Sequence, residues 1–182
     1  ARIFHLGTLL ADDFSLDVIK DLASRGTVAV DVQGYLRKVE GEQVVAVDYD
    51  EKLEAIPYIS ILKANEKEME VVTGESDPYR AARILAGWGC KEVLLTLGDK
   101  GSLIYDGTTF YEIPAIPATE LVDATGCGDT YMAGYLYKRS RGADFVEAGT
   151  FAAAMCTIKL ARKGPFTGTE EDVERLIATT SR

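Results

Sequence analysis

Histidine, cysteine and long apolar runs are all scarce in this 182-residue sequence, which has one histidine and three cysteines. The cysteines are odd in number and show no CxxC spacing, which argues against a disulfide framework and against a zinc site. No apolar stretch approaches the roughly 20 residues that a membrane-spanning helix needs. Two aspartates soon interrupt the short apolar segment at the start, so it does not resemble a secretory signal. These absences predict a cytoplasmic protein with reduced thiols and no membrane partner.

Positive charge is also in short supply. The sequence has 29 acidic and 20 basic residues, a net charge of −9, and no segment gathers lysine and arginine together. Binding to nucleic acid needs a basic surface that neutralises phosphates, so nucleic acid is excluded as the main partner. An anionic ligand would instead have to be held by a helix N-terminus, a single lysine or a metal ion.

The hydrophobic pattern predicts one α/β domain spanning residues 1–182. Short apolar segments that favour strands alternate with segments of helical periodicity, which is typical of a parallel sheet with crossover helices. Strands are expected at 2–6, 27–32, 59–64 and 92–97, and helices at 15–26, 50–56, 65–74, 77–89, 129–140, 144–162 and 169–179. Residues 39–49 fit a loop or a short hairpin. The Asp106-Gly107 turn predicts an antiparallel hairpin at one edge of the sheet.

The segment DATGCGDTYMAG, residues 123–134, places glycines immediately before a predicted helix. Successive glycines let backbone N–H groups converge, and a helix N-terminus adds partial positive charge, so Gly126 to Gly128 suit an anion such as phosphate. Asp129 would then be a base beside a phosphoryl group. The alternative is a turn needed only for packing, with Asp129 complementing the helix dipole. A Rossmann motif fits poorly, because Tyr131 stands where a further glycine is required.

Two further segments have the spacing of ligand-binding motifs. In NEKE, Asn65 and Glu68 are three residues apart on a predicted helix and could together face a ligand or the waters of Mg²⁺. A capping box, in which Asn65 and Glu68 bond each other's backbone, is the structural alternative. In TLGDKG, Thr96 and Gly98 follow a buried strand, where open α/β sheets bind ligands; a plain glycine turn is the alternative.

Taken together and in this order, the three segments resemble the ribokinase-like (PfkB) carbohydrate kinase family. DATGCGD is similar to that family's C-terminal signature, NEKE to its Asn-x-x-Glu motif, and TLGDKG to its Thr-x-Gly-x-x-Gly nucleotide segment. The resemblance implies a three-layer α/β/α fold with a mostly parallel sheet and an antiparallel edge hairpin. It covers essentially all of the chain but only the later part of a family member. The family's N-terminal region, with its lid, has no counterpart here.

The resemblance also implies a role for each matching residue. Asp129 would be the catalytic base, with Gly126, Cys127 and Gly128 forming the anion hole. Asn65 and Glu68 would organise Mg²⁺, with Glu68 acting through water, and Thr96, Gly98 and Gly101 would contact the nucleotide. Small residues of a later helix, Ala152 and Ala153, would lie against the adenine. Asp123 and Thr125 are candidate ligands of a monovalent cation such as K⁺.

The activity that follows from the resemblance is that of an ATP-dependent carbohydrate kinase. It would use Mg²⁺ to transfer the γ-phosphoryl group to a hydroxyl of a sugar, polyol or nucleoside, and a homodimer is a possible assembly. A competing hypothesis is a non-catalytic nucleotide-binding or interaction module derived from a truncated sugar kinase. The intact motif residues favour the enzyme, and the missing lid favours the module.

Overall fold

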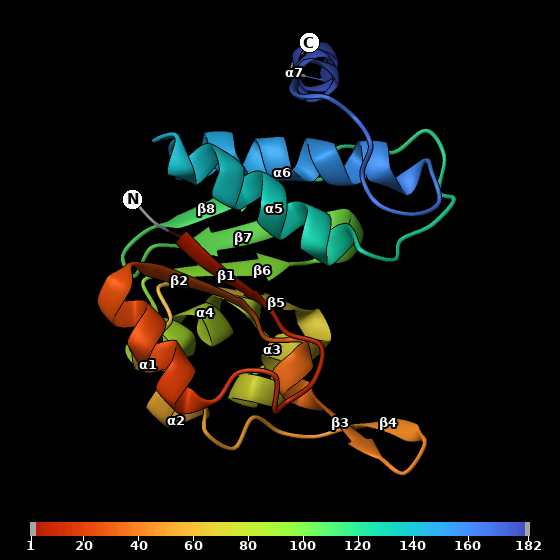
Figure 1. Cartoon of the computed structure of the whole chain (residues 1–182). Helices are drawn as coiled ribbons and strands as arrows, with labels where there is room; N and C mark the ends of the chain where they lie inside the picture. Colours follow the sequence, from red (N-terminus) through yellow and green to blue (C-terminus); the bar gives the residue numbers. More distant parts are fainter. Residues whose placement is uncertain (1–2, 181–182) are drawn as a thin grey trace. The chain divides into compact units, whose positions relative to one another are not determined.

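The computed structural model describes residues 3–180 (Figure 1). The chain divides into two compact units. Unit 1 comprises the residues up to Thr96 together with Leu103–Phe110, and unit 2 comprises Leu97–Ser102 and the residues from Tyr111 onward. No helix within residues 3–180 is both long and apolar enough to cross a bilayer.

A six-stranded sheet runs in the order β1-β2-β5-β6-β7-β8. Its strands are β1 (Ile3–Gly7), β2 (Thr27–Asp31), β5 (Ile61–Asn65), β6 (Glu92–Thr96), β7 (Ser102–Tyr105) and β8 (Phe110–Ile113). The first four pair in parallel, as the alternation of strands and helices predicts. The connection between β7 and β8 is too short for a parallel crossover, so this neighbouring pair is the predicted edge hairpin. The predicted strand at 2–6 is observed from Ile3, and Arg2 lies outside the described residues.

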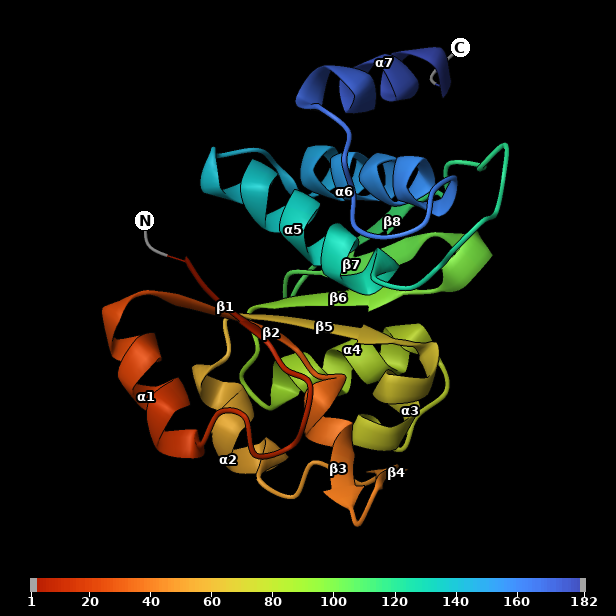
Figure 2. The ribbon, with the colours of Figure 1, turned by 45° about the vertical axis from the view of Figure 1, so that its right-hand side comes forward.

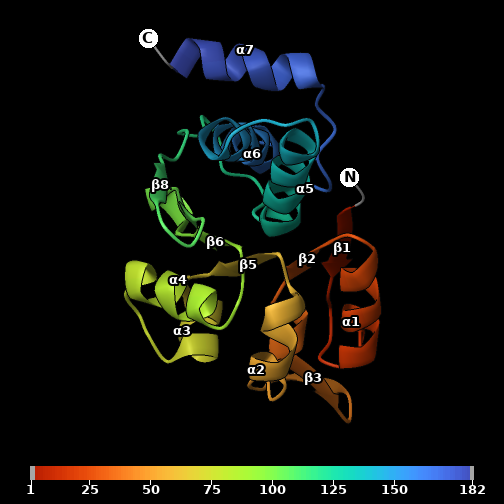
Figure 3. The same cartoon turned by 90° about the vertical axis from the view of Figure 1, so that its left-hand side faces the viewer.

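Unit 1 packs its helices on one face of these strands (Figure 3). They are α1 (Leu16–Arg25), α2 (Lys52–Ala55), α3 (Glu66–Thr73) and α4 (Pro78–Gly87). The central strands supply a dry core, in which Val28, Val30, Leu62 and Leu94 are fully buried. Near-continuous apolar strands of this kind are typical of parallel sheets.

Local sequence signals set the helix ends in unit 1. Asn65 caps the start of α3, and Gly74 ends it in the left-handed conformation, as the sequence predicts. Pro78 opens α4, and Asp77 caps it by accepting a hydrogen bond from the Arg80 N–H. Pro57 lies inside the 3-10 helix η2 (Ile56–Tyr58), which directly follows α2. A proline fits there because an N–H in a first turn needs no partner.

The segment expected to be a loop or a short hairpin forms the antiparallel pair β3 (Arg37–Glu40) and β4 (Gln43–Ala46), apart from the main sheet. It follows the 3-10 helix η1 (Gly34–Leu36) and projects from unit 1 (Figure 2). Most of its side chains are exposed. The hairpin is therefore held chiefly by its own ladder.

Unit 2 is mainly helical, with α5 (Cys127–Ser140), α6 (Phe145–Leu160) and α7 (Glu170–Thr180). Helix α6 packs against both α5 and α7, and Phe151, Ala154 and Val173 form a buried cluster. The helix predicted at 129–140 begins two residues earlier, so Cys127 and Gly128 lie in its first turn and Gly126 is the N-cap. The short 3-10 helix η3 (Gly98–Lys100) also belongs to this unit.

Candidate active site

The carboxyl ends of three parallel strands bring polar residues to one edge of unit 1. Asp31 ends β2, Asn65 ends β5 and Thr96 ends β6. Strand register places Asp31 beside Lys63, and Asn65 beside Thr96. Open α/β sheets bind ligands at this edge. The strand register therefore places Asp31, Asn65 and Thr96 at the edge where the sequence predicts a nucleotide.

A buried ion pair lies at this edge that the motif comparison did not single out. Lys63 Nζ lies 2.5 Å from Asp31 Oδ2, and both residues are almost inaccessible to solvent. The Gln33 N–H donates to Asp31 Oδ1 at 3.2 Å. Paired and hydrogen-bonded charges are the form in which buried charges are tolerated. The sequence does contain a signal for this ion pair, namely a lysine inside the apolar strand ILKA, because a buried charge needs a partner of opposite charge.

Asn65 and Glu68 form a complete capping box. Asn65 Oδ1 accepts from the N–H groups of Lys67 and Glu68, both at 3.0 Å, while Glu68 Oε2 accepts from the Asn65 N–H at 2.8 Å. Asn65 Nδ2 also donates to Glu68 Oε1 at 2.8 Å. The capping box, which is the structural alternative for the NEKE motif, is thus present. Each carboxylate oxygen keeps a further lone-pair site for a ligand or water.

Glu68 sits in an environment that resists its charge. Burial raises the pKa of its carboxyl, opposed by the Asn65 N–H and by the positive charges of Lys63 and Arg37. A groove of about 360 Å³ adjoins it, lined by the β3–β4 hairpin and by α3, with Arg37, Asn65 and Glu68 among its walls. Glu68 is therefore held rigidly beside an open space.

The TLGDKG residues divide between the units, with Thr96 in unit 1 and Gly98 and Gly101 in unit 2. Gly101 has a φ of 96°, and a Cβ there would lie 2.1 Å from the carbonyl oxygen of Ile113. Only glycine satisfies both the backbone conformation and the close approach. Packing alone explains Gly101, which supports the plain-turn interpretation for that residue.

The glycine turn of unit 2 leaves backbone donors free. Gly126 has a φ of 77° and caps α5 without any side-chain hydrogen bond to the helix. Within residues 3–180, the N–H groups of Gly128 and Asp129 have no protein acceptor. Unpaired N–H groups at a helix start attract anions. The start of α5 therefore presents two unpaired backbone N–H donors.

Asp129 lies in the first turn of α5, with an exposed side chain. Among the described residues it makes no hydrogen bond or ion pair. Its Oδ2 lies 3.9 Å from the position a Cβ on Gly126 would take, so the carboxylate folds back over the turn. An unpaired carboxylate beside free N–H donors can accept a proton from a hydroxyl bound there.

Asp123, at the start of the motif, is fully engaged. Its Oδ1 accepts from the Thr125 N–H at 2.9 Å, and its Oδ2 lies 3.2 Å from Nζ of the buried Lys159. The Thr125 hydrogen bond, with a smaller contribution from Lys159, holds the pKa of Asp123 well below its ordinary value. The Lys159 ammonium occupies the place of a counter-ion, so these residues do not fit K⁺ as they stand.

Two thiols also meet at the glycine turn. Cys156 Sγ donates to the Cys127 carbonyl oxygen at 3.2 Å. A hydrogen bond from the Cys156 side chain, aided by the charge of Lys159, lowers the pKa of the Cys127 thiol to about 7.

Of the small α6 residues expected near adenine, Ala152 is buried, and Ala153 keeps some exposure.

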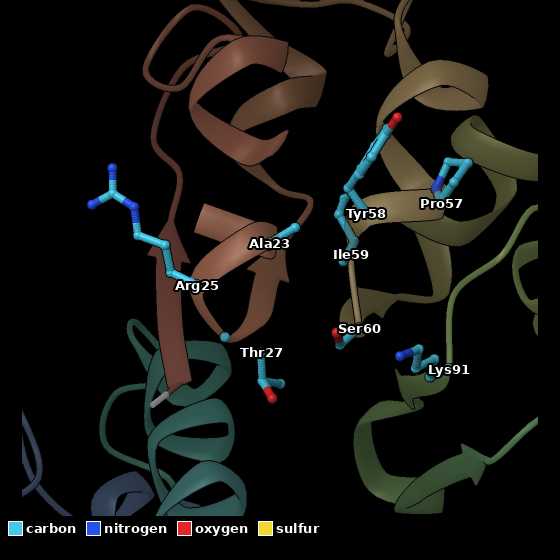
Figure 4. Close-up of a pocket in the computed structure, with 9 residues that line it drawn as sticks. Ala23, Arg25, Thr27, Pro57, Tyr58, Ile59, Ser60 and Lys91 are labelled. Carbon is cyan, nitrogen blue, oxygen red and sulfur yellow. The ribbon is translucent and has the colours of Figure 1, made fainter. Parts of the chain in front are cut away.

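The larger surface pocket of unit 1 lies at the opposite ends of the strands (Figure 4). It measures about 560 Å³, and Thr27, Ser60 and Lys91, at the amino ends of β2, β5 and β6, line it. No residue of the three motifs is part of it. Open parallel sheets bind ligands at the carboxyl ends of their strands, so this pocket lies at the edge where a ligand is not expected.

Within unit 1, the structure brings Asn65, Glu68 and Thr96 together. Within unit 2, it brings Gly126, Cys127, Gly128 and Asp129 together in one helical turn, with Asp123 and Thr125 just before it. The motifs therefore form two separate groups of contacts, one in each unit.

Comparison with known proteins identifies the family of the chain. The model of the pfkB family carbohydrate kinases matches residues 1–172. A cytidine kinase of Thermococcus kodakarensis is 47% identical over 91 residues, which are 49% of this chain and 32% of that protein. The matched segment thus spans about a third of that curated relative.

Similar solved structures include two kinases. A pyrophosphate-dependent kinase in the ribokinase family, complexed with a pyrophosphate analog and myo-inositol, has a TM-score of 0.85 at 30% identity, covering 96% of this chain and 63% of that one. Arabidopsis thaliana ribokinase, complexed with ribose and ATP, has a TM-score of 0.82 at 28% identity, covering 96% of this chain and 55% of that one. These matches confirm the predicted α/β/α fold class. The chain belongs to the pfkB family of carbohydrate kinases.

Proposed function

We propose that this chain carries the nucleotide-binding and catalytic part of an ATP-dependent phosphotransferase. Its acceptor would be a hydroxyl of a sugar, polyol or nucleoside. The observation that carries the proposal is the α5 N-terminus, where the exposed, unpaired carboxylate of Asp129 adjoins the free N–H groups of Gly128 and Asp129. The proposal takes residues 1–182 as one ribokinase-like domain in the cytoplasm, where ATP is available.

In the proposed reaction, Asp129 accepts the proton of the acceptor hydroxyl as its oxygen bonds to the γ-phosphorus of ATP. The bond between that phosphorus and the bridging oxygen breaks, and ADP leaves. The free N–H groups of the glycine turn hold the negative charge that gathers on the transferring phosphoryl group. These donors are fixed by the helix, so little reorganisation accompanies the transfer.

The residues of unit 1 fit a supporting role toward Mg²⁺. Both Glu68 oxygens already accept hydrogen bonds from Asn65 but keep further lone-pair sites, and Glu68 lines the adjoining groove. Residues 3–180 hold no cluster of three or more His, Cys, Asp or Glu side chains placed to bind a metal directly. Glu68 would therefore hold the ion through its waters, and Mg²⁺ supplies charge neutralisation of the phosphates when bound.

Several relatives point to a small-molecule acceptor. The similar proteins include a cytidine kinase, a ribokinase complexed with ribose and ATP, and a pyrophosphate-dependent kinase complexed with myo-inositol. Their acceptors are all hydroxyl compounds, which supports the class of acceptor proposed here. The donor needs its own test, because ATP and pyrophosphate both occur among these relatives.

The experiment measures phosphoryl transfer by the chain from ATP or from pyrophosphate to ribose, myo-inositol and cytidine. Calorimetry measures the binding of each donor to the chain in the presence of Mg²⁺. The proposal expects ATP binding and transfer to one of these acceptors. ATP binding without transfer to any of them would favour the non-catalytic module. Transfer from pyrophosphate alone would refute ATP as the donor, and no binding of either donor would contradict both functions.

A further inference from the structure

Two of the three cysteines lie against each other in unit 2. Cys127 is the first residue of α5, and Cys156 lies in the last turns of α6, the helix that packs on it. The Cys156 thiol donates to the Cys127 carbonyl oxygen at 3.2 Å, and the Cys156 side chain lowers the pKa of the Cys127 thiol. Residues 29 positions apart are thus brought together by helix packing.

The third cysteine provides an internal contrast. Cys90 is only 4% exposed, and its thiol donates to the Glu92 carbonyl oxygen at 3.3 Å within unit 1. Cys127 and Cys156 both keep partial exposure to solvent. A thiol reacts with a dissolved oxidant only where the oxidant can reach it, so exposure separates this pair from Cys90.

The start of α5 is also held by groups other than the two thiols. Gly126, not a cysteine, caps α5, and the Asp123 carboxylate is held by Lys159 and by the Thr125 N–H. Oxidation would remove the hydrogen bond from the Cys156 thiol to the Cys127 carbonyl oxygen, but not these contacts. The packing of α6 on α5 thus brings the Cys156 sulfur to 3.2 Å from the backbone of the residue that carries the other thiol.

We propose that Cys127 and Cys156 form a reversible oxidative modification site, at which a low-molecular-weight disulfide such as glutathione disulfide generates an intrachain disulfide. One protein thiol loses its proton and attacks a sulfur of glutathione disulfide, whose S–S bond breaks and releases one glutathione. The second protein thiol then attacks the protein sulfur of the mixed disulfide and releases the second glutathione. Two protein thiols are oxidised and one disulfide is reduced, and excess thiol reverses the exchange.

The bond would fix the first residue of α5 to α6, in the middle of the glycine turn. Rotating the Cys127 side chain into the bond changes the turn whose N–H groups are proposed to hold phosphate. This consequence rests on the proposed function, and it predicts that the oxidised chain binds ATP more weakly than the reduced chain. The bond itself can form whether or not the chain binds ATP.

The test incubates the full chain with glutathione disulfide, traps the remaining thiols with an alkylating agent, and maps the peptides by mass spectrometry. The expected product joins the Cys127 and Cys156 peptides and leaves Cys90 as the alkylated thiol. Both paired thiols should disappear at least about tenfold faster than Cys90, because buried thiols react slowly. Dithiothreitol should restore all three.

Matched variants isolate the pair. Cys90→Ala should still form the bond, while Cys127→Ser and Cys156→Ser should not, and thermal unfolding of each variant verifies that it is folded. The proposal is overturned if glutathione stays attached to Cys127 without an intrachain bond, if Cys90 joins the products equally, or if the folded chain resists oxidation altogether. Calorimetry with ATP on the reduced chain separately tests the proposed function, so the two failures are distinguishable.

Discussion

The polar groups of the strand edge in unit 1 and those of the glycine turn in unit 2 are handled in opposite ways. At the strand edge, Asp31 is paired with Lys63, and Asn65 and Glu68 satisfy each other. At the glycine turn, the Asp129 carboxylate and the N–H groups of Gly128 and Asp129 have no partner among the described residues. Satisfied groups hold a structure in place, whereas unsatisfied groups are available to a ligand. We therefore infer that the strand edge of unit 1 has a supporting role and that the glycine turn of unit 2 takes part in the reaction.

Breaking the buried ion pair should have the largest effect on stability. Lys63→Met leaves the Asp31 carboxylate buried without its partner, which should cost about 3–5 kcal/mol of unfolding free energy. Urea denaturation measures it. Lys67→Met, on the exposed face of α3, is the matched control and should stay within about 0.5 kcal/mol of wild type. Equal stabilities for the two variants would show that the Asp31–Lys63 pair is not a support.

Gly126→Ala should have the next largest effect. A side chain at φ 77° is strained although space is available, so we expect a loss of about 1–2 kcal/mol. Gly87→Ala, in α4, adds the same methyl group in open space without positive φ and should be neutral or stabilising by up to about 1 kcal/mol. Thermal unfolding compares them. A Gly126→Ala variant as stable as wild type would mean that α5 can begin without this turn.

Removing the α3 cap should cost less. Asn65→Ala deletes the acceptor for two N–H groups and should lower the unfolding free energy by about 1 kcal/mol. Asn65→Ser keeps an acceptor oxygen and should recover most of that loss. If serine were no better than alanine, the capping box would not be what stabilises this edge.

Acid should reveal the smallest effect, at Asp123. Because its pKa is depressed in the folded chain, its contribution to stability is present above the ordinary value of 3.8 and is lost as the pH falls below it. The unfolding free energy of Asp123→Asn should therefore fall less steeply with acidification than that of wild type. Asp12→Asn, an exposed carboxylate in unit 1, is the control and should follow wild type. If the unfolding free energies of Asp123→Asn and wild type fell equally with acidification, Asp123 would make no such contribution.

Local patterns predicted much of the fold. Helix caps such as Asn65 and Gly74, the Asp106-Gly107 turn and the parallel strands all follow from residues close in sequence. The start of α5 was placed two residues late, because glycine and cysteine favour helices weakly and packing on α6 decides the boundary.

The missed features depend on contacts between distant residues. The Asp31–Lys63 pair exists only because β2 and β5 take one particular register. The Lys159–Asp123 contact and the Cys127–Cys156 contact likewise require α6 to lie beside the glycine turn. No local spacing encodes these partners. The motif residues were found without a structure because their spacing is itself local.

The most direct test of the account is the rate of phosphoryl transfer by Asp129→Asn at saturating ATP, with the ATP dissociation constant measured alongside. Loss of the base should slow transfer by about 100-fold or more, a typical contribution of a general base. ATP should bind as tightly as to wild type or more tightly, because the substitution removes a negative charge beside the phosphates. An Asp129→Asn chain that transfers phosphate at the wild-type rate would contradict the central claim.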